Sequence, residues 1–376
     1  MKKLLFMIDT LNGGGAEKVL FDILNNFDYK KYEVDLFLIK KEGIYLEKLD
    51  KRVKIRSFFD KNDNFLKYFF DRKLYKLARK YPKLINLIIK DEYDVSIAFL
   101  EGRATKILSY KNGKKIAWVH IDLEKHRVLN FEEEKKYYSC YDRIVGVSNQ
   151  ATNAIKKLYP EISNKCLTIY NPIIVEDILI KAQRKEKVFN DNSKIKIVSV
   201  GRLARQKGFD ILLEAHKKLI DEKIEHEVYI LGNDGGEKEY LIKKIKEYNL
   251  ENSFFLIGFK ENPYSYIKQA DIFVSVSRYE GYSLVIAEAI CLEKPIISTK
   301  CVGPNELLDN GKYGIMIEPE NVEELSNAIK NLILNSELRK KYETLSLERR
   351  KIFNKKEVFE QIENLIDNLC IEDKKS

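Results

Sequence analysis

The chain has 376 residues, 44% of them hydrophobic and 33% charged, so we expect a globular protein with two domains of about 150–200 residues each. No stretch approaches the ~20 apolar residues of a membrane-spanning helix, the five cysteines form no C-x-x-C pair, and the four histidines have no metal-ligand spacing. These features argue against a membrane-spanning helix and a structural zinc site, and they favour a reducing compartment. The net charge is +9: the first 170 residues carry 34 Lys+Arg and 23 Asp+Glu, net +11, and the remainder carries 33 and 35, net −2.

Six short apolar runs in the first half are predicted to be β-strands, at residues 3–9, 34–40, 95–100, 115–120, 143–148 and 166–170. The N-terminus lacks the pattern of a signal peptide. After the first strand, Gly13-Gly14-Gly15 opens a predicted helix whose backbone amides suit an anion, although a plain tight turn is the alternative. Lys18 stands where the last glycine of G-x-G-x-x-G would be, so a nicotinamide cofactor is not favoured.

Positive charge concentrates at residues 61–90, which hold nine basic and two acidic residues. Apolar residues are interleaved with these cations: Phe65, Leu66, Phe69, Phe70, Leu74, Leu77 and Ile85. A basic amphipathic helix of this kind favours contact with an anionic membrane surface. The alternative is a solvated helix face over the core. We expect no nucleic-acid partner, because no nucleic-acid-binding module accompanies the charge.

His120 ends the fourth predicted strand, where its side chain is expected to face a ligand site; a packing histidine is the alternative. His126, His216 and His226 receive no role.

An interruption of the strand and helix pattern at about 171–193 starts with Asn171-Pro172 and indicates a linker between domains. We therefore predict an acceptor-side domain at 1–171 and a donor-binding domain at 172–354, with a C-terminal helix at 355–376 packing back on the first domain.

The second half repeats the pattern of apolar strands separated by helices, with strands predicted at 195–201, 226–232, 253–258, 272–277, 295–299 and 313–318. Such runs predict parallel sheets with both faces covered, and hence two doubly wound α/β domains facing a central cleft. After the first of these strands, "SVGRLARQKGF" places Arg202 and Lys207 beside a helix start, which suits a diphosphate. The alternative is two surface cations near a helix cap. The motif is not a Walker A loop, because Gly208 follows Lys207.

The stretch "YEGYSLVIAEA" places Glu280 in a loop and Glu288 in the helix that follows. Eight helical residues span ~12 Å, which is too far for the carboxylate pair of a retaining hydrolase. The helix start between them favours an anion, so the two acids suit the ends of a nucleotide-diphosphate sugar. The alternative is a loop Glu and a helical Glu in a salt bridge. The chain has no D-x-D, so we expect no metal at the diphosphate.

Taken together, these motifs resemble glycosyltransferase family 4, a family of retaining, nucleotide-sugar-dependent enzymes with the GT-B fold. The matching residues are "GGGAE" at 13–17, "VGRLARQKG" at 200–208 and the E-x7-E motif from Glu280 to Glu288. "YNP" at 170–172 and "GPNELL" at 303–308 are also typical. The resemblance covers nearly the whole chain in the family's order.

The resemblance implies a catalytic role for four residues: Glu280, Arg202, Lys207 and His120. Glu280 would hold donor-sugar hydroxyls, and Arg202 with Lys207 would stabilise the leaving diphosphate. His120 would lie near the donor sugar. The donor would also contact Glu288 at its ribose, the backbone amides of Ser283 and Leu284 at its phosphates, and Gly14 and Gly15 of the first domain.

The family implies a metal-independent hexosyltransferase without a cofactor. It would move a sugar from a UDP-sugar to a glycan or lipid-linked acceptor in surface polysaccharide or glycolipid synthesis. We expect a cytoplasmic protein, peripheral on the inner face of the cell membrane. Two alternatives stay open: a nucleotide-sugar epimerase of the same fold, and a non-catalytic GT-B-like partner subunit.

Overall fold

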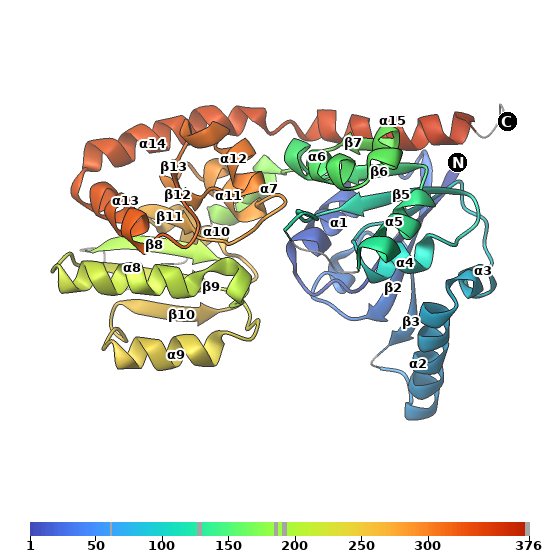
Figure 1. The fold of residues 1–376 in the computed structure, drawn as a ribbon, viewed down its shortest axis with the longest axis horizontal. Helices are drawn as coiled ribbons and strands as arrows, with labels where there is room; N and C mark the ends of the chain where they lie inside the picture. The colour runs from blue at the N-terminus through green and yellow to red at the C-terminus, as the bar shows by residue number, and fades with distance from the viewer. Residues whose placement is uncertain (61, 126–129, 184–186, 190–193, 373–376) are drawn as a thin grey trace. The chain divides into compact units, whose positions relative to one another are not determined.

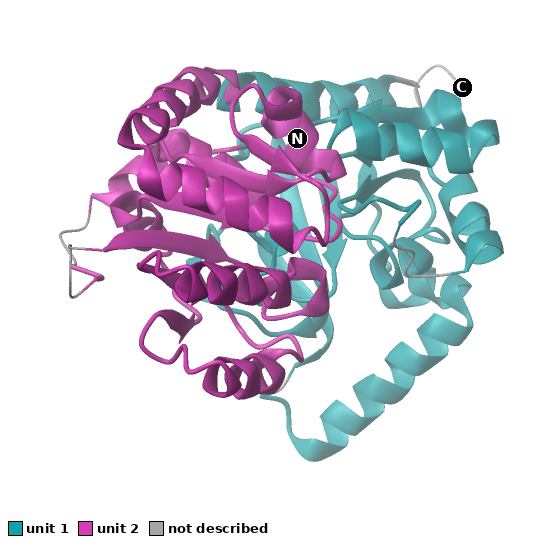
Figure 2. Cartoon of the chain, turned by 60° about the vertical axis from the view of Figure 1, so that its left-hand side comes forward, with its two compact units in different colours: residues 1–172, 355–376 teal, residues 173–354 magenta. Residues whose placement is uncertain are grey.

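The computed structural model describes residues 1–60, 62–125, 130–183, 187–189 and 194–372. It divides into two compact units (Figure 2). Unit 1 is Met1–Pro172 together with the C-terminal segment that begins at Lys355, and unit 2 is Ile173–Asn354. Each unit contains its own sheet and core, so each is described separately.

Unit 1 is built on a seven-stranded parallel sheet in the order β3-β2-β1-β4-β5-β6-β7. Its strands are β1 (Lys2–Ile8), β2 (Tyr32–Lys41), β3 (Lys54–Asp60), β4 (Val95–Ala98), β5 (Lys114–Val119), β6 (Arg143–Gly146) and β7 (Cys166–Thr168). Its helices are α1 (Gly15–Asn26), α2 (Phe65–Lys80), α3 (Ile85–Ile88), α4 (Arg103–Leu108), α5 (Phe131–Ser139), α6 (Asn149–Leu158) and α15 (Lys355–Glu372). The strand order reverses between β1 and β4, which is where ligands of doubly wound sheets bind.

The sequence did not predict β3. It is an edge strand whose burial alternates with exposure, so "KIRSFFD" lacks the continuous apolar run of the inner strands. Phe58 is its one fully buried side chain and packs edge-to-face on Phe37 of β2 at 5.0 Å between ring centroids.

Unit 2 is built on a six-stranded parallel sheet in the order β10-β9-β8-β11-β12-β13. Its strands are β8 (Ile195–Val200), β9 (His226–Leu231), β10 (Phe254–Gly258), β11 (Ile272–Ser275), β12 (Ile296–Thr299) and β13 (Ile315–Ile317). Its helices are α7 (Val175–Ala182), α8 (Phe209–Asp221), α9 (Lys238–Glu247), α10 (Tyr264–Gln269), α11 (Leu284–Cys291), α12 (Val302–Leu307), α13 (Val322–Leu334) and α14 (Ser336–Arg349). The order reverses between β8 and β11. The two sheets confirm the predicted fold class of two doubly wound α/β domains.

The last helix, α15, belongs to unit 1 (Figure 1), where it contacts β4 and the first residues of β1 and β2. Its apolar face is buried through Phe359, Ile362, Leu365, Ile366 and Leu369. Asp367 accepts hydrogen bonds from Lys2 Nζ at 2.6 Å and from Tyr32 Oη at 2.7 Å, which fixes the helix against the start of the sheet.

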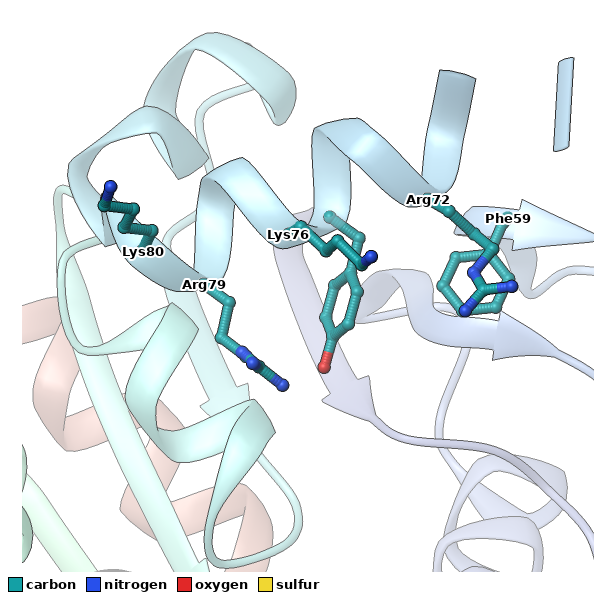
Figure 3. A pocket seen from close by; sticks show the side chains of 6 residues that line it. Phe59, Arg72, Lys76, Arg79 and Lys80 are labelled. Atoms are coloured by element: carbon teal, nitrogen blue, oxygen red, sulfur yellow. The ribbon is translucent and has the colours of Figure 1, made fainter. Parts of the chain in front are cut away.

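Helix α2 is largely exposed and projects away from the sheet of unit 1 (Figures 1 and 2). Ala78 is its only buried residue. A hollow of about 530 Å³ beside the helix is lined by Phe59, Arg72, Tyr75, Lys76, Arg79 and Lys80 (Figure 3). Within the described residues, no helix has the length and apolar content needed to cross a membrane.

Candidate active site

The switch point of unit 2 brings together Lys207 and Glu280, which are 73 residues apart in the chain. Lys207 ends a short 3-10 turn after β8, and Glu280 lies in the loop between β11 and α11. The Lys207 ammonium donates to the Glu280 carboxylate, and Ser277 Oγ donates to the same oxygen at 2.9 Å. The two charged side chains are only 19% and 11% exposed, so their attraction is weakly screened by water.

Two glycines allow the β8 loop to reach this position. Gly208 has φ +67°, and a Cβ there would lie 2.1 Å from the carbonyl oxygen of Val276 in the β11 loop. A Cβ on Gly201 would lie 3.1 Å from the Lys207 side chain. Only glycine therefore fits at 208, and the small residue at 201 leaves room for the lysine stem.

A second link between these loops involves Arg278, which the sequence analysis missed. Its guanidinium donates to both carboxylate oxygens of Asp210 at 2.9 and 2.8 Å, and its Nε donates to Glu320 at 2.8 Å. Burial alone would raise the pKa of Asp210, but the hydrogen bond and charge of Arg278 lower it below its usual value. Asp210 is therefore ionised at neutral pH, and this fork fixes the loop that carries Lys207. The only signal in the sequence was an arginine two residues before Glu280.

The helix start that follows Glu280 has an unsatisfied polar group. Ser283 is the N-cap of α11 and is 2% exposed, and its hydroxyl has no hydrogen-bond partner among the described residues. Leu284 is the first residue of that helix. Arg202 is exposed and forms no ion pair within the described part of the chain. An uncommitted guanidinium and an unpaired hydroxyl near a helix start are groups that a phosphate can satisfy.

Glu288 is the fifth residue of α11 and is 4% exposed. Tyr264 Oη donates to its Oε1 at 3.1 Å. The two acids of the E-x7-E motif are thus held by different partners, Glu280 by Lys207 and Glu288 by Tyr264. A carboxylate positioned by a tyrosine hydroxyl retains acceptor capacity for ligand hydroxyls.

The glycines predicted to meet the donor lie in unit 1, at the start of α1. Gly14 is the N-cap, and its N–H donates to the Glu17 carboxylate at 2.5 Å. Thr10 donates to the other oxygen of Glu17. The helix start is therefore already neutralised by the chain's own carboxylate, which a ligand phosphate at Gly14 and Gly15 would have to displace.

His120 directly follows β5 in unit 1 and is half-buried. Burial lowers its pKa to about 3, so the imidazole is neutral at pH 7. Its Nε2 is buried and has no hydrogen-bond partner in the described structure. Its backbone N–H donates to Glu101 Oε2 at 3.0 Å, and burial raises the pKa of Glu101 to about 6. Glu101, three residues past β4 at the switch point of unit 1, is a further candidate that the sequence analysis missed.

Two of the other three histidines are packed in a core, and the third lies outside the described residues. His216 and His226 lie in the core of unit 2, with Nδ1 and Nε2 2.8 Å apart, in keeping with the absence of a predicted role. His126 lies outside the described residues. Among the residues that are described, no three His, Cys, Asp or Glu side chains are grouped as a metal ion would require.

Comparison with known proteins finds a family model and full-length relatives that the chain resembles. Residues 180–346 match the family model described as glycosyl transferases group 1. The chain is 28% identical over 365 residues to the N-acetylgalactosamine-N,N'-diacetylbacillosaminyl-diphospho-undecaprenol 4-alpha-N-acetylgalactosaminyltransferase of Campylobacter jejuni, covering 94% of this chain and 96% of the relative. It is 25% identical to the amylovoran biosynthesis glycosyltransferase AmsD of Erwinia amylovora, covering 91% and 93%.

Solved structures share the fold across the whole chain. Anabaena HepE in complex with UDP matches with a TM-score of 0.76 at 20% identity, covering 98% of this chain and 100% of that one. Sucrose-phosphate synthase from Thermosynechococcus elongatus matches with a TM-score of 0.80 at 16% identity, covering 98% and 99%. These matches identify the fold as GT-B.

Proposed function

We propose that the chain is a retaining hexosyltransferase of the family 4 type that takes its sugar from a UDP-sugar. Its similarity to glycosyltransferases over nearly its full length supports transfer from a nucleotide sugar in glycan synthesis. The observation that carries the proposal is the Lys207–Glu280 pair at the β8–β11 switch point, beside the exposed Arg202 and the unpaired Ser283 hydroxyl.

In the proposed donor complex, the diphosphate lies at the start of α11. Arg202 binds it with its guanidinium fork, and Lys207 contributes a point charge that is already positioned by Glu280. The Ser283 hydroxyl and the α11 amides complete the anion site. Glu288, held by Tyr264, accepts from the ribose hydroxyls, and Glu280 accepts from hydroxyls of the donor sugar.

In the proposed reaction, the bond that breaks and the bond that forms at the anomeric carbon lie on the same face of the sugar. The bond to the β-phosphate oxygen breaks as the acceptor oxygen attacks, and the acceptor proton passes to the departing phosphate. Arg202 and Lys207 stabilise the charge that develops on UDP, a preorganised electrostatic contribution that lowers the barrier. No protein side chain is needed as a base, and no metal is invoked.

Unit 1 is proposed to hold the acceptor, a glycan or a lipid-linked sugar. The Campylobacter relative's name specifies an undecaprenol-linked acceptor, which supports a lipid-linked substrate for this chain. His120, neutral because of its burial, would meet the donor sugar, and Gly14 and Gly15 would approach the diphosphate. With a lipid-linked acceptor, the protein would work at the inner face of the cell membrane, with the segment 61–90 as its proposed contact.

Two steps test the proposal. A thermal-shift screen against UDP-, GDP- and ADP-sugars identifies the donor, and we expect stabilisation by a UDP-sugar. Incubation with that donor, with and without candidate acceptors, then distinguishes a transferase from an epimerase. NMR of the product gives its anomeric configuration. Conversion of the donor sugar without any acceptor would indicate an epimerase. If none of the nucleotide sugars binds, the result would support the alternative that the chain is a non-catalytic partner subunit.

A further inference from the structure

Helices α10 and α11, which lie side by side in unit 2, are tied together at two points (Figure 1). The first tie is the hydroxyl of Tyr264, the first residue of α10, which donates to Glu288 in the middle of α11 at 3.1 Å. The second tie lies at the other end of α10, where the Lys294 side chain reaches it from the loop after α11. Two ties about 9 Å apart, the length of six helical residues, restrain both the position and the rotation of α10.

Lys294 is an unusual group for a protein interior. It is 9% exposed, and no carboxylate of the described residues forms an ion pair with it. Its Nζ instead donates to the carbonyl oxygens of Lys268 and Ala270, at 2.8 Å each. Burial lowers the pKa of Lys294 to about 8, so the ammonium is still charged at neutral pH. Because lysines are rarely buried without a charged partner, this position costs free energy that the two hydrogen bonds offset.

The two carbonyl groups belong to the C-terminal end of α10. The last carbonyls of a helix have no partner within it, and a cation beside them interacts favourably with the helix dipole. The Lys294 backbone is itself fixed, because its carbonyl accepts from the Ser346 hydroxyl of α14 at 2.7 Å and its N–H donates to the Ala289 carbonyl of α11 at 3.1 Å. With only six residues, α10 depends on such external contacts for its stability.

We propose that Lys294 is a positioning residue for the donor's ribose, because it fixes the C-terminal end of α10 and thereby holds the Tyr264 hydroxyl where it orients the Glu288 carboxylate. The inference rests on the proposed function, which assigns the ribose hydroxyls to Glu288. A carboxylate accepts well only from a hydroxyl that lies in the direction of its lone pairs. A shift of α10 should therefore weaken the ribose contacts and leave the phosphate contacts at Arg202 and Lys207 in place.

The test compares two nucleotides that differ only at the ribose, UDP and 2′,3′-dideoxy-UDP, each titrated into the full chain by calorimetry. The ratio of their affinities is called the ribose preference. In the wild type it should be at least about tenfold, because the analogue lacks the hydroxyls that donate to a charged carboxylate. A lysine that only stabilised the fold would change both affinities alike and would leave this ratio unchanged.

The variant Lys294→Met keeps an unbranched apolar side chain but removes the ammonium, and should reduce the ribose preference to about twofold. Tyr264→Phe should reduce it as far, because it removes the other tie. The double variant should show no further reduction, since both substitutions break one chain of contacts. The matched control is Lys268→Met, because the Lys268 side chain lies on the same helix but is 45% exposed; this variant should keep the wild-type ribose preference.

The variants should bind 2′,3′-dideoxy-UDP as the wild type does, which also shows that they are folded. Equal weakening of both nucleotides in Lys294→Met would mean that the lysine is only structural, and would overturn the inference. If Lys294→Met does not fold, Tyr264→Phe decides, because it removes a single oxygen: a wild-type ribose preference there would also overturn the inference. If the wild type itself binds UDP no better than the analogue, the ribose contact in the proposed function is wrong, and the inference fails with it.

Discussion

Replacement of Lys207 by alanine tests the donor site most directly. The substitution removes a cation from the proposed diphosphate site and leaves Glu280 with only the Ser277 hydroxyl as a described partner. A hydrogen bond to a charged group contributes about 1.5–3 kcal/mol, so UDP affinity should fall about 10–150-fold. Transfer should fall by at least about 100-fold, because the same charge is needed in the transition state. Arg202→Ala should lower transfer to a similar degree.

The structure also predicts what a second substitution will restore. With Lys207 gone, the Glu280 carboxylate is largely buried and uncompensated, a cost of several kcal/mol when burial is complete. Since Glu280 is 11% exposed and keeps one donor, we expect a loss of about 1–3 kcal/mol in stability. Adding Glu280→Gln removes that charge, so the double variant should recover the melting temperature but not the affinity for UDP.

The assay is isothermal titration with UDP, which lacks the sugar and so isolates the phosphate and ribose contacts. Arg205→Ala is the matched control, because Arg205 lies on the same turn but pairs with Asp210 at 3.3 Å. Its UDP affinity should stay within about fivefold of wild type, the contribution of one exposed ion pair. If Glu280→Gln restores UDP binding to the Lys207 variant, Lys207 only neutralises Glu280, and its assignment to the diphosphate is wrong.

Three further predictions concern stability. Gly208→Ala should lower the melting temperature and the UDP affinity together. Residue 208 has φ +67°, and the added Cβ would lie 2.1 Å from the Val276 carbonyl oxygen, which costs at least about 1–3 kcal/mol in strain. Burial lowers the pKa of His216 to about 2 and also lowers the pKa of His226, so below about pH 6.5 the unfolded chain binds more protons than the folded one. The free energy of unfolding should therefore be highest above about pH 6.5 and fall as the pH is lowered. The variant His226→Gln should weaken this pH dependence in urea titrations. Asp367→Ala removes the bonds from Lys2 and Tyr32 and should cost about 1–3 kcal/mol, whereas the same change at the exposed Glu360 should be nearly neutral in thermal denaturation.

The fold was predictable because inner parallel strands are continuously apolar and interrupt the helical periodicity clearly. Edge strand β3 was missed for the opposite reason, since one half-solvated face breaks the apolar run. The motifs predicted Arg202, Lys207 and Glu280 in loops that follow strands, and Glu288 in the helix after the last of these loops.

The partners of these residues did not follow from the sequence. Lys207 meets Glu280 across 73 residues, and Arg278 meets Asp210 across 68. Such pairs depend on which strands are neighbours in the sheet, and a single sequence does not specify that order. Glu101 was missed because its burial beneath the β5 loop, which raises its pKa, has no local signature.

The return of α15 to unit 1 has a consequence for biosynthesis. Unit 2 is one continuous segment, Ile173–Asn354, but unit 1 needs the helix that starts at Lys355. At about 5–20 residues per second, the ribosome needs roughly 10–40 s to synthesise the intervening segment. During that time the nascent unit 1 lacks the buried apolar face of α15 and the hydrogen bonds to Asp367. The usual vectorial order is therefore reversed: the downstream unit can finish folding first, and the upstream unit is completed last.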